Sequence, residues 1–224
     1  LHRVAGGKLM KLFGGRLRFL GIGGAKLDGG AEKFLLEARV PYAIGYGLTE
    51  TAPLLAGAAP SMVRLGSPGP QAPGVELRLE NVNPETRQGE IVARTPSAMV
   101  GYFKNPEATK EAFTADGWFR TGDLGELDKD GWLYIKGRLK NMIVGPGGEN
   151  IYPGEVTNVI MQLCDDVAEV AVYGVPDETW GEHVKASVVL MPGSRLTAEA
   201  LRQYCRAHMP TFRCLLYTSD AADD

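Results

Sequence analysis

The chain has 224 residues, 44% of them hydrophobic and 23% charged, a composition typical of a globular protein with one large or two small domains. The formal charge is −3, from 24 basic and 27 acidic side chains, and the basic residues are scattered along the chain, which disfavours a nucleic-acid partner. No run approaches the ~20 apolar residues of a membrane span, and Cys164, Cys205 and Cys214 are too widely spaced for a metal site, which favours reduced thiols in a cytoplasmic protein.

The first predicted elements alternate between apolar runs and glycine-rich turns. Residues 17–28 (LRFLGIGGAKLD) predict a buried strand that runs into a glycine turn, and residues 30–38 predict a helix. Residues 40–51 (VPYAIGYGLTET) predict a second strand that enters a second turn. This alternation indicates α/β packing.

From residue 66 to about residue 137 the pattern changes to short alternating runs that are broken by Pro and Gly. Three of these runs, VELRLE, GEIVART and WLYIKGR, predict strands and thus a β-rich subdomain.

Beyond residue 140 the sequence predicts a small α+β domain. A helix is expected from Pro153 to Leu163, because proline suits the first helical turn. Two strands are expected next, AEVAVYGV and HVKASVVLM, followed by a helix that opens at Thr197.

We therefore expect a fold of α/β and α+β class. Residues 1–139 would be the end of a large domain, with its β-rich part at 66–139, and residues 140–213 a small lid-like domain. Residues 214–224 (CLLYTSDAADD) fit neither pattern, and we expect a non-native tail there.

Three motifs could carry chemistry. In YGLTET, residues 46–51, Gly47 would let the backbone approach a ligand, a Thr hydroxyl could donate to phosphate, and a Glu could hold Mg²⁺. The alternative is that the six residues form an ordinary turn between a strand and a loop.

The second motif is GWFRTGDLGELDKDGWLYIKGRLK, residues 117–140. Asp123 stands between glycines on an expected tight turn, where a carboxylate could accept hydrogen bonds from both hydroxyls of a ribose, and Arg138 could reach the same nucleotide. The alternative is a β-hairpin with its turn at DKDG and a structural ion pair between these two residues.

The third motif is GPGGENIYP, residues 145–153. It is similar to a phosphate-binding glycine loop but lacks the Gly-Lys-Ser/Thr ending. By itself it is weak evidence for a phosphate site, and the alternative is a flexible turn.

The order of these motifs resembles the adenylate-forming, or AMP-binding, superfamily of acyl-CoA synthetases, peptide-synthetase adenylation domains and luciferases. YGLTET, GEIVARTPSAMVGYFKNPEAT, GWFRTGDLG, GWLYIKGRLKNMIV and GGENIYPGEV look like five successive motifs of that superfamily, and the resemblance extends from about residue 21 to residue 213.

The resemblance implies roles for five nucleotide-binding residues. Tyr46 would stack on adenine, Thr49 would bind the phosphates, and Glu50 would hold the Mg²⁺ of MgATP. Asp123 and Arg138 would bind the ribose hydroxyls.

It also implies roles around the acyl group. Gly23, Gly24 and Ala25 would line the adenine and acyl pockets. Lys140 would be the hinge on which the C-terminal domain rotates, and Gly147–Gly148 would swing in beside the pantetheine arm of the thiol acceptor.

The implied activity is that of a long-chain fatty acid–CoA ligase, which uses ATP, Mg²⁺ and coenzyme A and releases AMP and pyrophosphate. Peripheral membrane contact is possible for such an enzyme. An acyl–acyl-carrier-protein synthetase, an aryl acid–CoA ligase and a non-catalytic nucleotide-binding module are the alternatives.

Two family features are missing from the sequence. We find neither the Ser/Thr/Gly-rich phosphate loop with its lysine nor a C-terminal catalytic lysine, since no lysine follows Lys185, and the first residue is not Met. We therefore expect a fragment with little or no ligase activity of its own.

Overall fold

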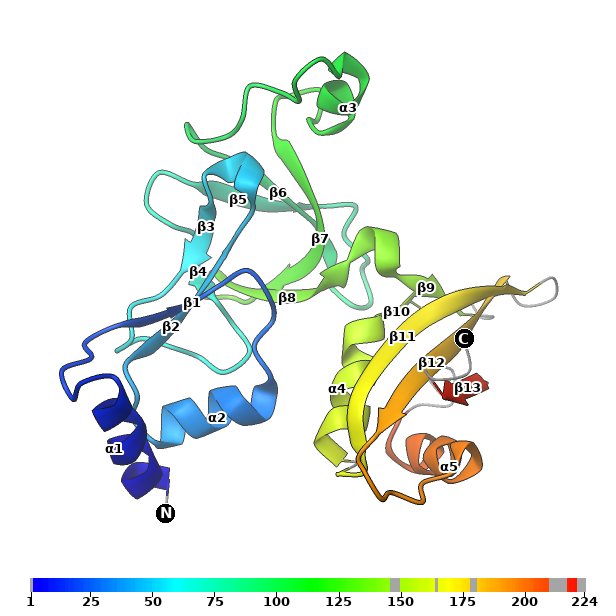
Figure 1. Ribbon diagram of the computed structural model, residues 1–224. Coiled ribbons are helices and arrows are strands. Elements are labelled where there is room, and N and C mark those ends of the chain that lie inside the picture. Colours follow the sequence, from blue (N-terminus) through cyan, green and yellow to red (C-terminus); the bar gives the residue numbers. More distant parts are fainter. Residues whose placement is uncertain (1, 146–149, 164, 178–180, 210–216, 221–224) are drawn as a thin grey trace. The chain divides into compact units, whose positions relative to one another are not determined.

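The computed structural model describes residues 2–145, 150–163, 165–177, 181–209 and 217–220 (Figure 1). The chain divides into two units, Leu1–Lys136 and Gly137–Asp224. This division falls shortly before Lys140, where the sequence suggested a domain boundary, and that boundary stays a prediction. None of the helices in the described residues has the length and apolar character of a membrane span.

The first unit begins with a three-stranded sheet in the order β1-β2-β3, accompanied by two helices (Figure 1). β1 and β2 run parallel and β3 is antiparallel to β2. The elements are α1 (His2–Leu12), β1 (Leu20–Ile22), α2 (Gly29–Glu37), β2 (Tyr42–Gly47), a 3₁₀ turn (Thr49–Thr51) and β3 (Leu54–Gly57).

Helix α2 begins where the sequence provides a cap. The Asp28 carboxylate accepts a hydrogen bond from the backbone N–H of Ala31 at 2.8 Å, which satisfies one of the unpaired donors at the helix start. The helix then buries Leu35 and, just after its last turn, Ala38 against Tyr42 of β2. The parallel pair β1–β2 and this helix confirm the α/β pattern.

Glu32 is a charged residue in the core of this layer and is only 4% exposed. Its carboxylate accepts hydrogen bonds from the Tyr42 hydroxyl at 3.3 Å and from the backbone N–H of Gly66 at 3.0 Å. Burial, together with the nearby Glu32 charge, raises the pKa of Tyr42 to about 12. The buried carboxylate thus joins α2, β2 and the loop after β3.

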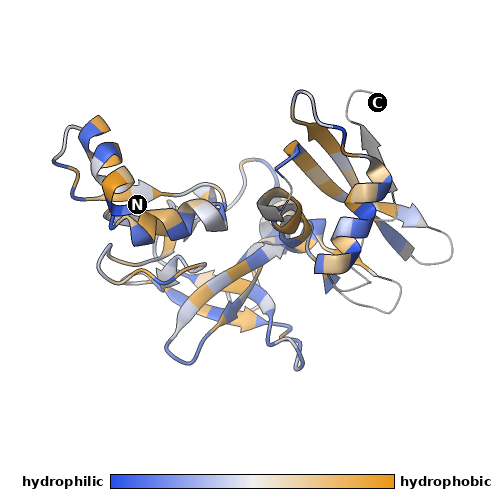
Figure 2. Cartoon of the chain, turned by 90° about the horizontal axis from the view of Figure 1, so that it is seen from below, coloured by the Kyte–Doolittle hydropathy of each residue, from blue (hydrophilic) through white to orange (hydrophobic). Residues whose placement is uncertain are grey.

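A five-stranded sheet in the order β4-β8-β7-β6-β5 completes the first unit. Apolar and polar residues alternate along β5, whereas β6 carries three consecutive apolar residues, Ile91, Val92 and Ala93, all fully buried. One face of the sheet covers a core around Ala56, Ile91 and Leu133. Figure 2 shows hydrophobic residues interspersed with hydrophilic ones along the strands. The elements are β4 (Gly69–Pro70), β5 (Glu76–Glu80), β6 (Gly89–Arg94), α3 (Pro106–Glu111), β7 (Phe119–Leu127) and β8 (Trp132–Arg138). The expected β-rich subdomain is confirmed.

The second unit packs two helices against a sheet of its own. β11 and β12 form an antiparallel hairpin, and the backbone of β13 pairs with β12 in parallel. The elements are a 3₁₀ turn (Leu139–Asn141), β9 (Ile143–Val144), β10 (Asn150–Ile151), α4 (Pro153–Leu163), β11 (Val167–Asp177), β12 (Gly181–Leu190), α5 (Ala198–His208) and β13 (Tyr217–Asp220).

Both helices predicted for this unit are present. Helix α4 has the predicted bounds, and α5 follows its cap Thr197, whose hydroxyl accepts from the N–H of Ala200 at 3.2 Å. Leu201 and Cys205 of α5 are buried in the same core as Val156 of α4. The α+β character of the second unit, and with it the predicted fold class, is confirmed.

The sequence analysis did not predict helices α1 and α3, nor strand β13 in the C-terminal segment. Helix α1 contains Gly6 and Gly7 and shows a weak apolar stripe, and α3 has only six residues. Residues 214–224 were set aside as a non-native tail, which stays a prediction. Within that range the structure describes Tyr217–Asp220, whose backbone extends the sheet of the second unit.

Candidate functional site

The turn after β2 carries the YGLTET motif and is closed by contacts within the chain. The N–H of Leu48 donates to the carbonyl of Pro53 at 3.0 Å. A Cβ on Gly47 would lie 1.6 Å from that carbonyl oxygen, far inside van der Waals contact. The sequence predicted that Gly47 lets a ligand approach the backbone. In the structure, the close approach of the Pro53 carbonyl already requires a glycine at this position.

The side chain of Thr51 lies at the centre of this turn and is fully buried. Its hydroxyl accepts from the N–H of Leu48 at 3.2 Å and donates to the carbonyl of Pro53 at 2.8 Å. Ala52 follows in the left-handed region, with φ of 51°. The turn is therefore rigid, and it presents the exposed Thr49 and the half-buried Glu50 at its surface.

A loop from the other sheet fastens the same turn. The N–H of Met99 donates to the carbonyl of Glu50 at 2.7 Å, and the hydroxyl of Ser97 donates to the carbonyl of Thr51 at 2.8 Å. The sequence analysis missed Thr51 and Ser97, since nothing in the spacing of the motifs shows which loop packs on which turn.

The tertiary structure brings together two of the predicted site residues, Tyr46 of β2 and Asp123 of β7. The hydroxyl of Tyr46 donates to Oδ2 of Asp123 at 2.7 Å, although the two residues are 77 positions apart. Asp123 is only 5% exposed, and its own N–H donates to the hydroxyl of Thr121 at 3.1 Å. Asp123 is therefore held by hydrogen bonds at both its carboxylate and its backbone N–H.

The tight turn expected at Asp123 is wrong, because Asp123 lies inside strand β7. The register shows a β-bulge there: Leu124 pairs with Glu90, and Arg120 pairs with Val92. Three residues of β7 thus face a single residue of β6, and Gly122 among them adopts φ of +68°. Such a bulge re-aims side chains, and it can turn this carboxylate toward Tyr46.

Glu50 also has a partner that the sequence analysis missed. The hydroxyl of Tyr102 donates to Oε1 of Glu50 at 3.0 Å. Burial raises the pKa of Tyr102, and the bond to the Glu50 carboxylate raises it further. Among the described residues, no group of three or more His, Cys, Asp and Glu side chains could hold a metal ion by itself. A metal at Glu50 would therefore need further ligands, such as the phosphates of a nucleotide.

Gly23, Gly24 and Ala25 follow β1 and are exposed. Because β1 and β2 are parallel neighbours, these residues lie at the same edge of the sheet as the turn that carries Thr49 and Glu50. In open α/β sheets, ligands bind at the carboxyl ends of the parallel strands. The structure thus brings two of the predicted motifs to one edge.

An open apolar pocket of about 370 Å³ lies on the same three-stranded sheet. Small residues of the strands form part of its wall, among them Gly21, Ala43 and Gly45, and the side chains of Phe19 and Leu54 add to it. Gly45 of this wall directly precedes Tyr46 in strand β2.

The remaining predicted residues belong to the second unit. Arg138 is exposed at the end of β8, and Lys140 is exposed in the 3₁₀ turn Leu139–Asn141 that follows it. Gly147 and Gly148 lie outside the described residues. The expected action of Asp123 and Arg138 on one ribose stays a prediction, because these residues belong to different units.

Comparisons with known proteins agree with the order of these motifs. Residues 4–103 match the profile described as AMP-binding enzyme, and residues 155–217 match the AMP-binding enzyme C-terminal domain. The chain is 40% identical over 197 residues to 2-succinylbenzoate–CoA ligase from Geobacillus sp. (strain WCH70), with 84% of this chain and 39% of the relative covered. It is 35% identical over 201 residues to a long-chain-fatty-acid–CoA ligase from Mycobacterium tuberculosis (strain CDC 1551 / Oshkosh), with 88% of this chain and 39% of that protein covered.

A solved structure is similar as well. The o-succinylbenzoate CoA synthetase from Bacillus subtilis, in complex with an acyl-adenylate intermediate, matches with a TM-score of 0.82 and 31% identity, over 94% of this chain and 45% of that one. The chain thus spans about two fifths of the length of the curated relatives that it matches.

Proposed function

The chain belongs to the AMP-binding enzyme superfamily, and from that premise we propose that it is part of an ATP-dependent acid–CoA ligase. The whole protein would join a carboxylic acid to AMP with release of pyrophosphate, and would then pass the acyl group to the thiol of coenzyme A with release of AMP.

The observation that carries this proposal is the contact between Tyr46 and Asp123. A buried carboxylate beside an aromatic ring suits a nucleoside, because the carboxylate can accept bonds from the ribose hydroxyls while the ring stacks on the base. A bound nucleotide would have to replace or share the hydrogen bond between Tyr46 and Asp123. Binding is favourable only if the ribose hydroxyls donate to the carboxylate in place of the Tyr46 hydroxyl. Thr49 and Glu50, on the turn after Tyr46, would face the phosphates.

The residues present are compatible with Mg²⁺ bound as MgATP. Mg²⁺ usually keeps several water ligands and takes one or two carboxylates together with substrate phosphates, so one carboxylate such as that of Glu50 is a suitable protein contribution. When bound, the ion would neutralise phosphate charge. Thr49 would donate its hydroxyl to a phosphate oxygen, and the rigid turn below it would fix the direction of that donor.

The chemistry requires positioning more than a strong nucleophile in the protein. In the first step a carboxylate oxygen of the acid bonds to the α-phosphorus, and the bond from that phosphorus to pyrophosphate breaks. In the second step the sulfur of coenzyme A bonds to the acyl carbon, and the bond to AMP breaks. Asp123 and Tyr46 would hold the adenosine part through both steps, so that the reacting phosphorus stays in place.

For the acid we propose a fatty acid as the first candidate. The pocket beside Gly45 supports an apolar acyl group, because its wall is made of glycine, alanine and aliphatic or aromatic side chains. An aryl acid is the second candidate, favoured by the similarity to a 2-succinylbenzoate–CoA ligase at 40% identity. A carrier protein in place of coenzyme A remains the alternative acceptor.

Arg138, Lys140 and the Gly147–Gly148 loop keep their proposed roles in ribose binding, domain rotation and thiol access. Lys140 stands in a 3₁₀ turn that connects β8 to β9, close to the division between the units, which supports a hinge at this position. The cytoplasmic location also stays a prediction.

The test is release of pyrophosphate from ATP with Mg²⁺ and a panel of acids, namely octanoate, palmitate, 2-succinylbenzoate and ferulate. We expect the whole protein to release pyrophosphate with at least one of them, and this 224-residue chain to release little. Strong release by the chain alone would contradict its expected inactivity. AMP binding without turnover by the whole protein would favour the non-catalytic nucleotide-binding module.

A further inference from the structure

The segment from Gly101 to Thr109 (GYFKNPEAT) lies within one of the motifs on which the family resemblance rests, and the proposed function uses none of its residues. It begins in the loop between strand β6 and helix α3 and ends within that helix, and it contains Tyr102, whose hydroxyl donates to Glu50. The contacts around Tyr102 explain why this short sequence has its particular composition.

The backbone of Tyr102 is anchored by the start of α3. The hydroxyl of Thr109 accepts from the N–H of Tyr102 at 2.9 Å and donates to the carbonyl of Asn105 at 2.8 Å. Asn105 in turn caps the helix, since its side chain accepts from the N–H of Ala108 at 3.0 Å. Pro106 occupies the first helical turn, where its fixed φ is an advantage.

Gly101 allows this anchoring. A Cβ at this position would lie 2.7 Å from Cγ2 and 2.9 Å from the hydroxyl oxygen of Thr109. Its φ of +154° is also one that side-chain-bearing residues rarely adopt. Any larger residue at position 101 would therefore push Thr109 away from the N–H of Tyr102.

The same stretch of chain fixes Glu50 at two points. The N–H of Met99 holds the backbone carbonyl of Glu50 at 2.7 Å, and the hydroxyl of Tyr102 holds its side-chain Oε1 at 3.0 Å. A glutamate side chain on a turn normally samples several rotamers, and ordering it costs free energy when a ligand binds. Here much of that ordering is already done by the fold.

We infer that Tyr102 is a positioning residue for Glu50, held in place by Thr109 and oriented so that the second carboxylate oxygen is presented to a divalent cation. This rests on the proposed function, in which Glu50 contacts the metal of MgATP. Groups that orient a metal ligand in this way typically contribute 10–100-fold to metal affinity.

The experiment measures two affinities of the 224-residue chain by calorimetry. One is the affinity for AMP without metal, and the other is the Mg²⁺ concentration that half-saturates the binding of ATP. The variant is Tyr102→Phe, which removes only the hydroxyl. Tyr173→Phe is the matched control, because it removes a hydroxyl that lies 3.1 Å from the Ser187 hydroxyl on the sheet of the second unit.

For Tyr102→Phe we expect the Mg²⁺ requirement to rise roughly 10-fold, while the AMP affinity changes less than 2-fold. Tyr173→Phe should change neither value. Thr109→Val, which removes the anchor of Tyr102 and keeps the side-chain shape, should raise the Mg²⁺ requirement by a smaller factor. A parallel loss of AMP affinity and of melting temperature in Tyr102→Phe would show a structural role only, and would overturn the inference.

The outcomes separate this inference from the function on which it rests. If Glu50→Gln leaves the Mg²⁺ requirement unchanged, the proposed role of Glu50 fails and the inference fails with it. If the unaltered chain binds neither AMP nor ATP, the same variants are compared in the whole protein that contains this chain, with the same expected results. If Glu50→Gln raises the requirement and Tyr102→Phe does not, only the positioning role of Tyr102 is wrong.

Discussion

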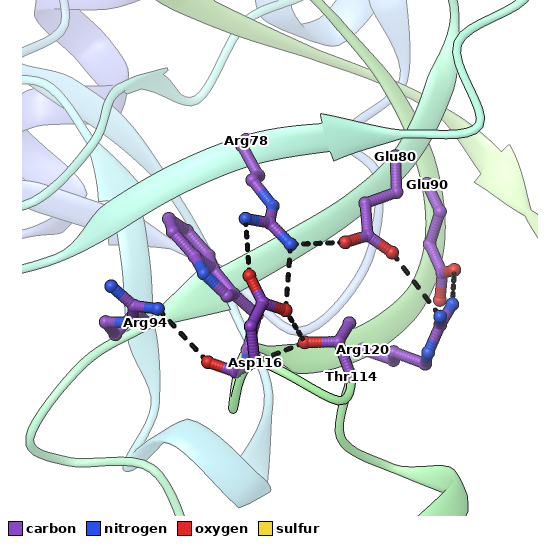
Figure 3. Close-up of polar contacts among 8 residues, drawn as sticks. Arg78, Glu80, Glu90, Arg94, Thr114, Asp116 and Arg120 are labelled. Atoms are coloured by element: carbon purple, nitrogen blue, oxygen red, sulfur yellow. Dashed lines mark hydrogen bonds and ion pairs between the residues drawn. The ribbon is translucent and has the colours of Figure 1, made fainter.

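Two polar clusters of the first unit are built in different ways. The candidate site contains Tyr46, Asp123, Glu50 and Tyr102, and its carboxylates accept hydrogen bonds from phenol hydroxyls. The second cluster, which we call the guanidinium cluster, lies on the five-stranded sheet beside Trp118. It contains Arg78, Glu80, Glu90, Arg94, Thr114, Asp116 and Arg120 (Figure 3).

In the guanidinium cluster each carboxylate faces an arginine. Arg78 binds Asp116 at 2.9 Å and Glu80 at 2.5 Å, while Arg120 binds Glu90 at 2.5 Å and lies 3.4 Å from Glu80 (Figure 3).

The ring of Trp118 carries two arginines of this cluster. The guanidinium groups of Arg78 and Arg94 stack on it at 4.4 Å and 4.5 Å from the ring centroid. Trp118 itself is 7% exposed. Such stacking adds to the burial of a large aromatic side chain and makes this cluster a stabilising feature of the sheet.

The difference between the clusters lies in the backbone that carries them. The residues of the guanidinium cluster come mainly from the strands β5, β6 and β7, and their long side chains bring arginines and carboxylates of neighbouring strands within ion-pair distance. The site residues stand where regular structure is interrupted: at the end of β2, in a 3₁₀ turn, at a bulge of β7 and in a loop before α3. Interruptions of this kind can aim side chains at a ligand, whereas the regular register mainly supports the fold.

The largest expected effect concerns stability. Replacement of Trp118 by alanine should lower the free energy of unfolding by about 3–5 kcal/mol, because a buried aromatic ring and two stacked guanidinium groups lose their contacts. Urea unfolding followed by circular dichroism measures this change. Trp118→Phe should lose much less, and AMP affinity should be unaffected in that variant. A large loss of AMP affinity in Trp118→Phe would break the distinction between the clusters.

The next effect concerns binding. Asp123→Ala should weaken AMP binding about 10–150-fold, because the loss of one charge-assisted hydrogen bond to ribose costs about 1.5–3 kcal/mol. Calorimetric titration with AMP measures it. Asp116→Ala is the control, since it removes a carboxylate of the guanidinium cluster and should leave AMP affinity unchanged. Equal losses of AMP affinity in both variants would mean that the substitutions disturb the sheet in general and do not remove a ribose contact.

The smallest effect concerns pH. The bond from the Arg78 guanidinium, helped by the Thr114 hydroxyl, lowers the pKa of Asp116 from 3.8 to about 2. A pKa that is lower in the folded state means stability that is present above the unfolded-state value and is lost as the pH falls through about 2. Because Asp116 is exposed, solvent screens the effect and keeps it small.

The corresponding measurement compares the unaltered chain with Asp116→Asn between pH 5 and pH 2.5. The melting temperature of the unaltered chain should be the higher one at pH 5, and the difference should shrink toward the acid end. A difference that stays constant with pH would mean that the Asp116 charge does not contribute.

The sequence by itself determined the features that depend on neighbouring residues. Pro153 and Thr197 mark helix starts, the short runs broken by Pro and Gly mark β5 and β6, and the order of the motifs identified the superfamily. These features were predictable because capping, periodicity and turn preference act over a few residues. The same reasoning failed at Asp123, where a local glycine signal suggested a turn and strand pairing produced a bulge instead.

Only the tertiary structure decided how the site is assembled. It joined Tyr46 to Asp123 across 77 positions, placed Pro53 against Gly47, and brought Tyr102 to Glu50. These contacts depend on the register between strands and on which loop packs on which turn. That arrangement is fixed by burial of the whole core, and no short stretch of sequence contains it.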